Sequence, residues 1–288
     1  MDLSRMTELA TRYLANYGSN NPGLNRLCAF REEAPSEIEV SVYEPALCLI
    51  LQGSKMASIG DQSIKLSPGK ALLISHDLPV VSRITKASAS EPYLSFVLFL
   101  DVQLIRGLYE QVADLPPPNP DVRSLSVASA EASWLGSFLR YIELMDKPLD
   151  AKVLGPSILR EIHYRLLLSS IGQNLRNLLV ADSYASRIAK AIGQLRSEYR
   201  SPLRVSELAK IAAMSDSSFH KHFKDVTGTT PLQFQKDLRL IQAKVLLKEM
   251  GNAVSDAAFA VGYESPAHFS RDYSRRFGLA PSSDAARF

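Results

Sequence analysis

The chain has 288 residues, of which 46% are hydrophobic and 22% charged, and its formal net charge is +3 at pH 7. These values are those of an ordinary globular protein, and the length favours two domains. Only two cysteines occur, Cys28 and Cys48, too few for a secreted disulfide scaffold, so a reducing cytoplasm is expected. No apolar run approaches the roughly 18 residues of a membrane span. The first residues predict an amphipathic helix, not a signal peptide, because Arg5, Glu8 and Arg12 interrupt the apolar positions.

The charge is distributed unevenly along the chain. From Asp182 onward there are 16 Lys and Arg against 11 Asp and Glu, a net charge of +5. The preceding part has 17 against 19, a net charge of −2. A basic segment joined to a mildly acidic one is typical of a protein that binds nucleic acid at one end only.

The first hundred residues predict one helix followed by short strands. The helix runs from about Leu3 to Tyr17 and ends at Gly18, and Gly60-Asp61 and Ser67-Pro68-Gly69 have the composition of turns. Strand-like runs lie near Ile38–Tyr43, Leu47–Gln52, Lys55–Ile59, Ser63–Leu66, Lys70–Ile74, Val80–Ile84 and Tyr93–Leu100. About seven short strands at this spacing indicate a small barrel or sandwich, whose interior can hold one small ligand.

Helices are predicted from residue 102 to the domain boundary. The first covers Val102–Val112, and a proline-rich surface loop follows at Asp114–Asp121. Two longer helices at Ala130–Met145 and Leu154–Ser169 place apolar residues at helical spacing. The second of these is apolar enough to bury one face on the barrel and another on a second subunit. The stretch Gly172–Ser183 is the candidate boundary between a domain of residues 1–181 and one of residues 182–288.

The second domain predicts about seven helices and no strands. Ser206 is placed to cap a helix over Val205–Ala212, and Gly251 to end a long helix that begins at Pro231. The helical patterns lie at Ser186–Tyr199, Val205–Ala212, Asp216–Val226, Pro231–Met250, Val254–Val261 and Pro266–Phe277.

Two similar stretches lie fifty residues apart within this domain. Met214–Pro231 has the sequence MSDSSFHKHFKDVTGTTP, and Glu264–Pro281 has the sequence ESPAHFSRDYSRRFGLAP. Each predicts a short helix with two aromatic residues four positions apart on a buried face: Phe219 and Phe223, then Phe269 and Tyr273. These pairs are interpreted as core packing and imply no cofactor. The opposite faces carry His, Lys, Ser and Arg, the donors that a helix needs to enter a DNA groove.

These residues resemble the DNA-binding domain of the AraC/XylS family of bacterial transcription regulators. The resemblance covers Ser186 to Phe288 and is carried by LAKIAAMSDSSFHKHFKDVTGTTPLQFQKDLRL and AFAVGYESPAHFSRDYSRRFGLAP. The first domain is similar to one subgroup of the family through LCLILQGSKMASIGDQSIKLSPGKALLISHDLPVVSRI and EPYLSFVLFLD. The resemblance implies an α+β fold: a cupin-like β-barrel with flanking helices that support dimerisation, then an all-α domain of two helix-turn-helix units.

The resemblance also implies which residues contact DNA. The family places its two recognition helices in successive major grooves, about 34 Å apart. The positions that match the base-reading ones are Ser217, His220 and Lys221, then Pro266, Ala267, His268 and Arg271. Lys221 and Arg271 are the candidates for guanine contacts, because a long donor reaches O6 and N7. Phosphate contacts are expected from Ser215, Lys224, Ser265, Arg275 and Arg276.

The turns before the two predicted helices differ in one residue. The family usually has Gly before the Met-Ser pair of the first turn, where this chain has Ala213, whereas the second turn keeps Gly262. If that position needs a positive φ, Ala costs on the order of 1 kcal/mol.

His222 alternates with His220, so it faces another side of the helix and is expected to be partly packed or on the phosphate side. Ordinary solvated charges are the alternative for Lys221 and Arg271, which their matched placement disfavours.

The sequence argues against catalysis in the barrel. A metal cupin needs several His and a carboxylate around one ion, and the first domain has only His76 and His163, without an HxH pair. His76 is interpreted as a loop or core residue. No GxSxG or GxxxxGK[ST] motif occurs. We therefore expect no catalytic residue, metal or cofactor. Cys28 and Cys48 are interpreted as small apolar residues, with redox or electrophile sensing as the alternative.

The leading hypothesis is a cytoplasmic, sequence-specific DNA-binding transcription regulator, an activator if it follows most of the family that it resembles. Expected partners are double-stranded promoter DNA, RNA polymerase, a second copy of the chain and a small-molecule effector in the barrel, but no membrane. The effector is expected near Leu49, Leu51, Phe96 or Leu98. Three alternatives stay open: a regulator whose barrel only dimerises, a barrel enzyme fused to a DNA-binding domain, and an architectural protein that binds nucleic acid without sequence preference.

Overall fold

The computed structural model describes residues 3–21, 23–60, 62–112, 124–180, 182–250 and 253–286, without the side chains of residues 249 and 250. Three predictions fall outside these residues: the loop Asp114–Asp121, Gly251 as a helix end, and Asp61 of the first predicted turn. None of the helices in these ranges is long and apolar enough to cross a membrane.

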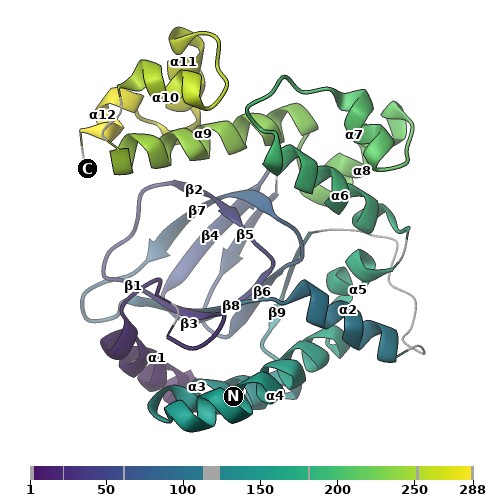
Figure 1. The fold of residues 1–288 in the computed structure, drawn as a ribbon. Coiled ribbons are helices and arrows are strands. Elements are labelled where there is room, and N and C mark those ends of the chain that lie inside the picture. Colours follow the sequence, from purple (N-terminus) through teal and green to yellow (C-terminus); the bar gives the residue numbers. More distant parts are fainter. Residues whose placement is uncertain are drawn as a thin grey trace.

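The N-terminal domain is built on two antiparallel sheets that face each other (Figure 1). One has the strand order β1-β8-β3-β6-β9 and the other β2-β7-β4-β5. The strands are β1 (Leu27–Glu32), β2 (Glu39–Tyr43), β3 (Ala46–Gln52), β4 (Ser54–Ile59), β5 (Gln62–Leu66), β6 (Lys70–Ile74), β7 (Leu78–Lys86), β8 (Tyr93–Phe99) and β9 (Leu125–Ser129). The barrel-like architecture was predicted. Strands β1 and β9 were not, because both are edge strands with a single pairing partner and a weaker apolar pattern.

Three helices cover the outer face of the five-stranded sheet (Figure 1): α1 (Leu3–Tyr17), α3 (Ala132–Ile142) and α4 (Pro148–Leu168). The ring of Phe96 packs there, 5.6 Å from Tyr13 and 6.0 Å from Phe138 between centroids. The same cluster contains Leu49, Leu51 and Leu98.

The expectation that Leu49, Leu51, Phe96 and Leu98 face the barrel interior is therefore wrong. Side chains alternate along a strand, so Cys48 and Ile50 face the interior instead. The sequence could not reveal this, because β3 is buried on both faces and its apolar run does not alternate.

Three shorter helical segments complete the described part of this domain. They are α2 (Val102–Gln111), the short 3₁₀ helix η1 (Glu143–Asp146) and α5 (Gln173–Leu179). Helix α5 lies inside the stretch that was predicted as the boundary, and its Leu175 and Leu179 are buried in the same core as α4. The chain then passes into α6 after residue 183.

The second domain contains seven helices and no strand in its described residues, as predicted. They are α6 (Tyr184–Ser197), α7 (Val205–Ile211), α8 (Asp216–Thr227), α9 (Pro231–Met250), α10 (Val254–Ala260), α11 (Pro266–Phe277) and α12 (Pro281–Ala285). The predicted cap of α7 is wrong: its N-cap is Arg204, and Ser206 lies inside the first turn.

The two domains pack against each other through apolar contacts. Helix α9 lies over the outer face of the four-stranded sheet, where Val40 clusters with Leu240 and Ile241 (Figure 1). A second cluster joins Ile59 and Leu78 of the barrel with apolar residues of α6 and α8. The first helix-turn-helix unit therefore sits directly on the barrel.

Candidate nucleic-acid interface

Helices α8 and α11 have the same local design. Each is 12 residues long. Each begins at a serine, Ser215 or Ser265, whose hydroxyl oxygen accepts a backbone N–H three residues on at 3.4 Å. Each ends at a glycine in the left-handed conformation, Gly228 with φ +72° and Gly278 with φ +77°. The fifty-residue repeat thus produces two helices of the same length with the same caps.

The turn before each of these helices also needs a left-handed residue. Ala213 has φ +51° and Gly262 has φ +89°. The following N–H groups close the preceding helix in the same way: Met214 donates to the Ala209 carbonyl at 2.9 Å, and Tyr263 to the Ala258 carbonyl at 3.0 Å. The condition stated for Ala213 is therefore met, and the first turn carries a strain on the order of 1 kcal/mol.

The buried face of each helix holds the predicted aromatic pair. Phe219 and Phe223 lie 5.4 Å apart at an angle of 54°, and Phe269 and Tyr273 lie 5.4 Å apart at 56°. All four side chains are fully buried. Their assignment to the core is confirmed, and it fixes which face of each helix is turned outward.

The outward faces carry the predicted base-reading residues. On α8, Ser217, His220 and Lys221 are exposed. On α11, Ala267, His268 and Arg271 are exposed and Pro266 is half-buried at the first position. Within the described ranges, neither Lys221 nor Arg271 forms an ion pair, so both cations are available to an external partner.

The predicted phosphate contacts fall into three groups. Lys224 and Arg275 are exposed cations. The hydroxyls of Ser215 and Ser265 act as helix caps. The Nη2 of Arg276 lies 2.8 Å from Oδ2 of Asp237, whose side chain is buried, so this guanidinium is held within the domain.

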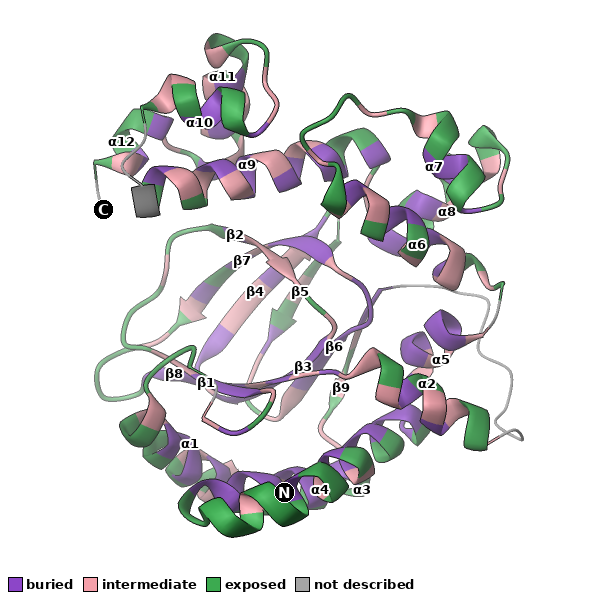
Figure 2. Ribbon diagram, viewed as in Figure 1, coloured by how far each residue is buried: buried purple, intermediate pink, exposed green. Residues whose placement is uncertain are grey.

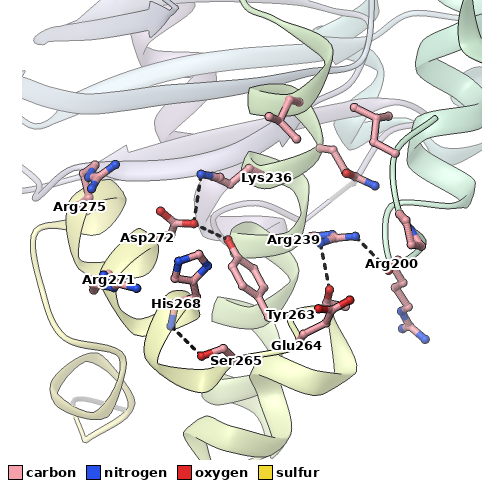
Figure 3. Close-up of a pocket in the computed structure, with 15 residues that line it drawn as sticks. Arg200, Lys236, Arg239, Tyr263, Glu264, Ser265, His268, Arg271, Asp272 and Arg275 are labelled. Atoms are coloured by element: carbon pink, nitrogen blue, oxygen red, sulfur yellow. Dashed lines mark hydrogen bonds and ion pairs between the residues drawn. The ribbon is translucent and has the colours of Figure 1, made fainter. Parts of the chain in front are cut away.

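A basic groove of about 920 Å³ separates the two units (Figure 3). Its cationic lining includes Arg200, Lys236, Arg239, Arg271 and Arg275. Arg200, Lys236 and Arg239 were not predicted from the sequence, because they lie outside the repeated stretches. The sequence shows them only as cations in two separate segments, α9 and the loop that precedes α7. Only the fold brings these two segments together.

Comparison with known proteins connects this geometry to a family. Residues 23–174 match the family described as the AraC-type transcriptional regulator N-terminus, and residues 208–287 match a helix-turn-helix domain. The chain belongs to the AraC-type transcriptional regulators. The first match covers more than half of the 288 residues, and the matched helix-turn-helix domain contains both candidate recognition helices.

Curated AraC-type relatives match part of the chain. The transcriptional regulator CdhR of Pseudomonas aeruginosa is 31% identical over 143 residues, 48% of this chain and 43% of that protein. The transcriptional activator RhaS of Escherichia coli is 27% identical over 184 residues, 62% of this chain and 63% of that protein. The matched part of the chain thus spans 43% to 63% of the length of these relatives.

Solved structures support the fold. ToxT from Vibrio cholerae aligns with a TM-score of 0.55 at 13% identity and covers 90% of this chain and 97% of ToxT. A second ToxT structure, bound to an unsaturated fatty acid, aligns with a TM-score of 0.54 at 12% identity, over 90% and 94% of the two chains. At this identity the likeness concerns the arrangement of both domains.

In this AraC-type chain, a buried polar network joins the first helix-turn-helix unit to the barrel. Nδ1 of His76 lies 2.8 Å from the Ser75 hydroxyl, and its Nε2 lies 3.2 Å from the Ala185 carbonyl on α6. The Ser124 hydroxyl donates to the Val226 carbonyl of α8 at 2.6 Å. Burial lowers the pKa of His76 to about 4, although the bond to Ala185 opposes this. His76 is therefore neutral at pH 7, and the interpretation of a packed residue is confirmed.

Two further contacts join the barrel to the second domain near this network. Arg196 of α6 bonds Asp77 at 2.7 Å. A Cβ on Gly60, in the β4–β5 turn, would lie 1.9 Å from the carbonyl oxygen of Gly228, so the turn meets the end of α8 backbone to backbone. The barrel rim thus contacts the C-terminal cap of a candidate recognition helix.

The barrel interior carries a few polar groups among apolar walls. The ammonium of Lys55 lies 5.4 Å from the ring centre of Tyr43, whose hydroxyl donates to that of Ser82 at 3.1 Å. The hydroxyl of Tyr93 is buried without a hydrogen-bond partner among the described residues. Apolar walls with a small number of polar groups are typical of a site for a small ligand.

The other histidines and the cysteines have local roles. His222 stacks on Tyr184 at 3.6 Å between ring centres, so it is partly packed as expected. Within the described residues there is no group of three or more His, Cys, Asp or Glu that could hold a metal. Cys28 and Cys48 are buried and free, and burial raises the pKa of both thiols, which disfavours a reactive thiolate.

Proposed function

We propose that this chain is a sequence-specific DNA-binding transcription regulator whose two helix-turn-helix units contact two half-boxes of promoter DNA. The observation that carries the proposal is the matched geometry of α8 and α11, with equal caps, equal aromatic pairs and exposed donors. Base contacts come from Ser217, His220, Lys221, Pro266, Ala267, His268 and Arg271. Phosphate contacts come from Lys224 and Arg275, with smaller contributions from Ser215, Ser265 and Arg276.

The direct test is selection of bound sequences from random duplex DNA with the full chain. An enriched site with two half-boxes about one helical turn apart is expected. Lys221→Ala and Arg271→Ala should each weaken binding to that site by about 1–3 kcal/mol and relax the preference at one base position. Lys210→Ala, an exposed cation on α7 outside the recognition helix, is the matched control.

Two results would contradict this assignment. If the Lys221→Ala, Arg271→Ala double variant binds the selected site as tightly as the wild type, the readers are misassigned. If no sequence is enriched, and unrelated DNA competes equally at moderate salt, the chain is an architectural protein without sequence preference.

For regulation, we propose a small-molecule effector inside the barrel, bound near Tyr43, Lys55 and Tyr93. The contacts of His76 and Ser124 with α6 and α8 support a route from the barrel to the first unit. An effector shifts the equilibrium between arrangements of the domains only if it binds them with different affinity. The ToxT structure with a bound unsaturated fatty acid is compatible with a ligand-binding role for this fold.

A screen of small molecules against melting temperature and DNA affinity tests the effector. Hits should lose their effect in Lys55→Met or Tyr93→Phe. If no compound changes either quantity, the alternative of a barrel that only dimerises gains support. A stoichiometric metal in the purified protein would instead revive a barrel enzyme.

We also propose that the chain forms a homodimer, activates transcription and acts in the cytoplasm. Helix α4 has an exposed face (Figure 2), and its exposed apolar residues support a homodimer. Leu149 is 80% exposed, Val153 71% and Leu154 48%. Relatives described as activators support activation, and hence contact with RNA polymerase. Promoter binding supports a cytoplasmic location. Transcription in vitro with and without the selected site would show activation or repression.

A further inference from the structure

A single guanidinium connects the two helix-turn-helix units across the basic groove. Arg239 lies on α9, between the loop after α6 and the turn before α11 (Figure 3). Its Nε donates to the carbonyl of Tyr199 at 2.7 Å, and its Nη2 to the carbonyls of Arg200 at 3.0 Å and Ser201 at 2.9 Å. Its Nη1 donates to the carbonyl of Gly262 at 3.0 Å.

The segments that Arg239 joins also touch directly. A Cβ on Gly262 would lie 2.2 Å from the carbonyl oxygen of Arg200, so the two backbones meet at van der Waals distance. On the first-unit side, Gln235 adds bonds to the carbonyls of Tyr199 at 3.0 Å and Ser201 at 2.7 Å. The loop of residues 199–201 is therefore fixed to α9, and the second turn is fixed to that loop.

The second unit is also held against α9 by two ion pairs. Lys236 pairs with Asp272 of α11 at 3.2 Å, and Asp237 pairs with Arg276 at 2.8 Å. These contacts limit rotation of α11 around α9, but they do not reach the first unit. Arg239 contacts both units, so it controls how one is oriented relative to the other.

This role requires arginine in particular. The planar fork uses four of its five N–H groups, on carbonyls from two separate segments. Lysine presents three donors from one point and cannot reach all four acceptors. Removing the guanidinium would take away this donor from the carbonyls of Arg200 and Gly262, whereas those of Tyr199 and Ser201 keep their bonds to Gln235. The side-chain link between the second turn and the loop of residues 199–201 would then be lost.

We propose that Arg239 is a positioning residue that fixes the spacing at which the two units bind DNA. The inference rests on the proposed function, because it assumes that α8 and α11 each contact a half-box. Inserting one base pair moves the second half-box by about 3.4 Å along the axis and, at 10–10.5 base pairs per turn, rotates it by about 35°. A locked pair of units cannot follow this change, whereas an unlocked pair can.

The experiment uses the full chain and the duplexes that the wild type selects from the random pool. The separation of the half-boxes is varied by one or two base pairs in either direction, and each half-box is also tested alone. The wild type should prefer its selected spacing by about tenfold over the neighbouring ones. Arg239→Met should reduce this preference to less than about threefold and leave binding to an isolated half-box within about twofold of wild type.

Two further variants separate the proposed role from general effects. Arg200→Met removes a cation from the same groove, and its side chain bonds only Tyr199 within the described structure, so its spacing preference should equal that of the wild type. Arg239→Lys keeps the charge and should still lose the spacing preference. It also preserves the test if Arg239→Met folds poorly, which thermal unfolding would show.

A measurement without DNA makes the result independent of the proposed function. Spin labels at Lys224→Cys and Arg275→Cys report the distance between α8 and α11. The distance distribution should be narrow with Arg239 present and broader in both Arg239 variants. Unchanged distributions together with an unchanged spacing preference overturn the inference, as does an equal loss of affinity at every spacing and on isolated half-boxes. A wild type that selects no sequence but shows the broadening overturns the DNA-binding function alone.

Discussion

Nε2 of His76 lies 3.2 Å from the carbonyl oxygen of Ala185, although 109 positions separate the two residues. His76 belongs to the turn between β6 and β7, and Ala185 to the first turn of α6, so this contact crosses the domain interface. A neutral imidazole donates through Nε2 to Ala185 and accepts at Nδ1 from Ser75. Protonation would place a positive charge in a buried site, where the neighbouring hydroxyl group stabilises it only weakly.

This contact predicts a specific pH dependence of stability. The ordinary pKa of histidine is 6.5, and that of folded His76 is about 4. Between these values the unfolded chain binds a proton that the folded chain does not, so stability falls as the pH falls. Through His76 alone, the free energy of unfolding should drop by about 2 kcal/mol between pH 7.5 and pH 5.

Urea unfolding of wild type and His76→Asn at both pH values measures this effect. His163 is also buried, and its lowered pKa contributes in the same direction, but it is present in both proteins. The difference between the two pH dependences therefore isolates His76. Equal dependences would show that His76 is not held neutral at the interface.

Ala213→Gly should stabilise the first unit. Ala213 has φ +51°, a conformation in which glycine has no steric penalty, so a gain of about 0.5–1 kcal/mol is expected after the entropy of the unfolded chain is deducted. Thermal or urea unfolding measures it. The reverse change in the second unit, Gly262→Ala, should destabilise, because its Cβ would lie 2.2 Å from the Arg200 carbonyl oxygen. A loss of stability in Ala213→Gly would contradict the strain.

Substitutions of two neighbouring arginines of α11 should change different quantities: one the free energy of unfolding, the other the affinity for DNA. Arg276 pairs with the buried carboxylate of Asp237, so Arg276→Ala should cost about 1–3 kcal/mol of unfolding free energy. Arg275 is exposed, so Arg275→Ala should leave stability unchanged within about 0.5 kcal/mol. It should instead reduce the salt dependence of DNA binding by about one charge. The reverse pattern would exchange the roles of the two side chains.

The exposed apolar residues of α4 predict a dissociable dimer. Changing Leu149 and Val153, 80% and 71% exposed, to serine should convert a dimer into a monomer in sedimentation equilibrium without loss of folding. Phe259→Ser removes an apolar side chain that is 55% exposed on α10 and serves as the control. A wild type that is monomeric at all concentrations would rule out this interface.

Features that depend on a few neighbouring residues were predicted from the sequence. The aromatic pairs of α8 and α11 and their outward donors follow from helix periodicity, whereas a positive φ at Ala213 was stated only as a condition. Two of these signals were reinforced because the repeat shows them twice. The prediction failed at Ser206, because the local sequence does not distinguish a serine within the first turn of a helix from a serine that caps it.

The sequence by itself therefore determined the strand-rich and helical parts and the two matched units, because periodicity, caps and turns are encoded within a few residues. Only the tertiary structure decided which face of β3 lines the barrel, that His76 bonds α6, that Arg276 is held by Asp237, and that Arg239 joins both units. These depend on contacts between segments that are distant along the chain. A strand buried on both faces has no polar alternation, and an arginine has the same sequence signal whether its partner is a phosphate or a carbonyl group of its own chain.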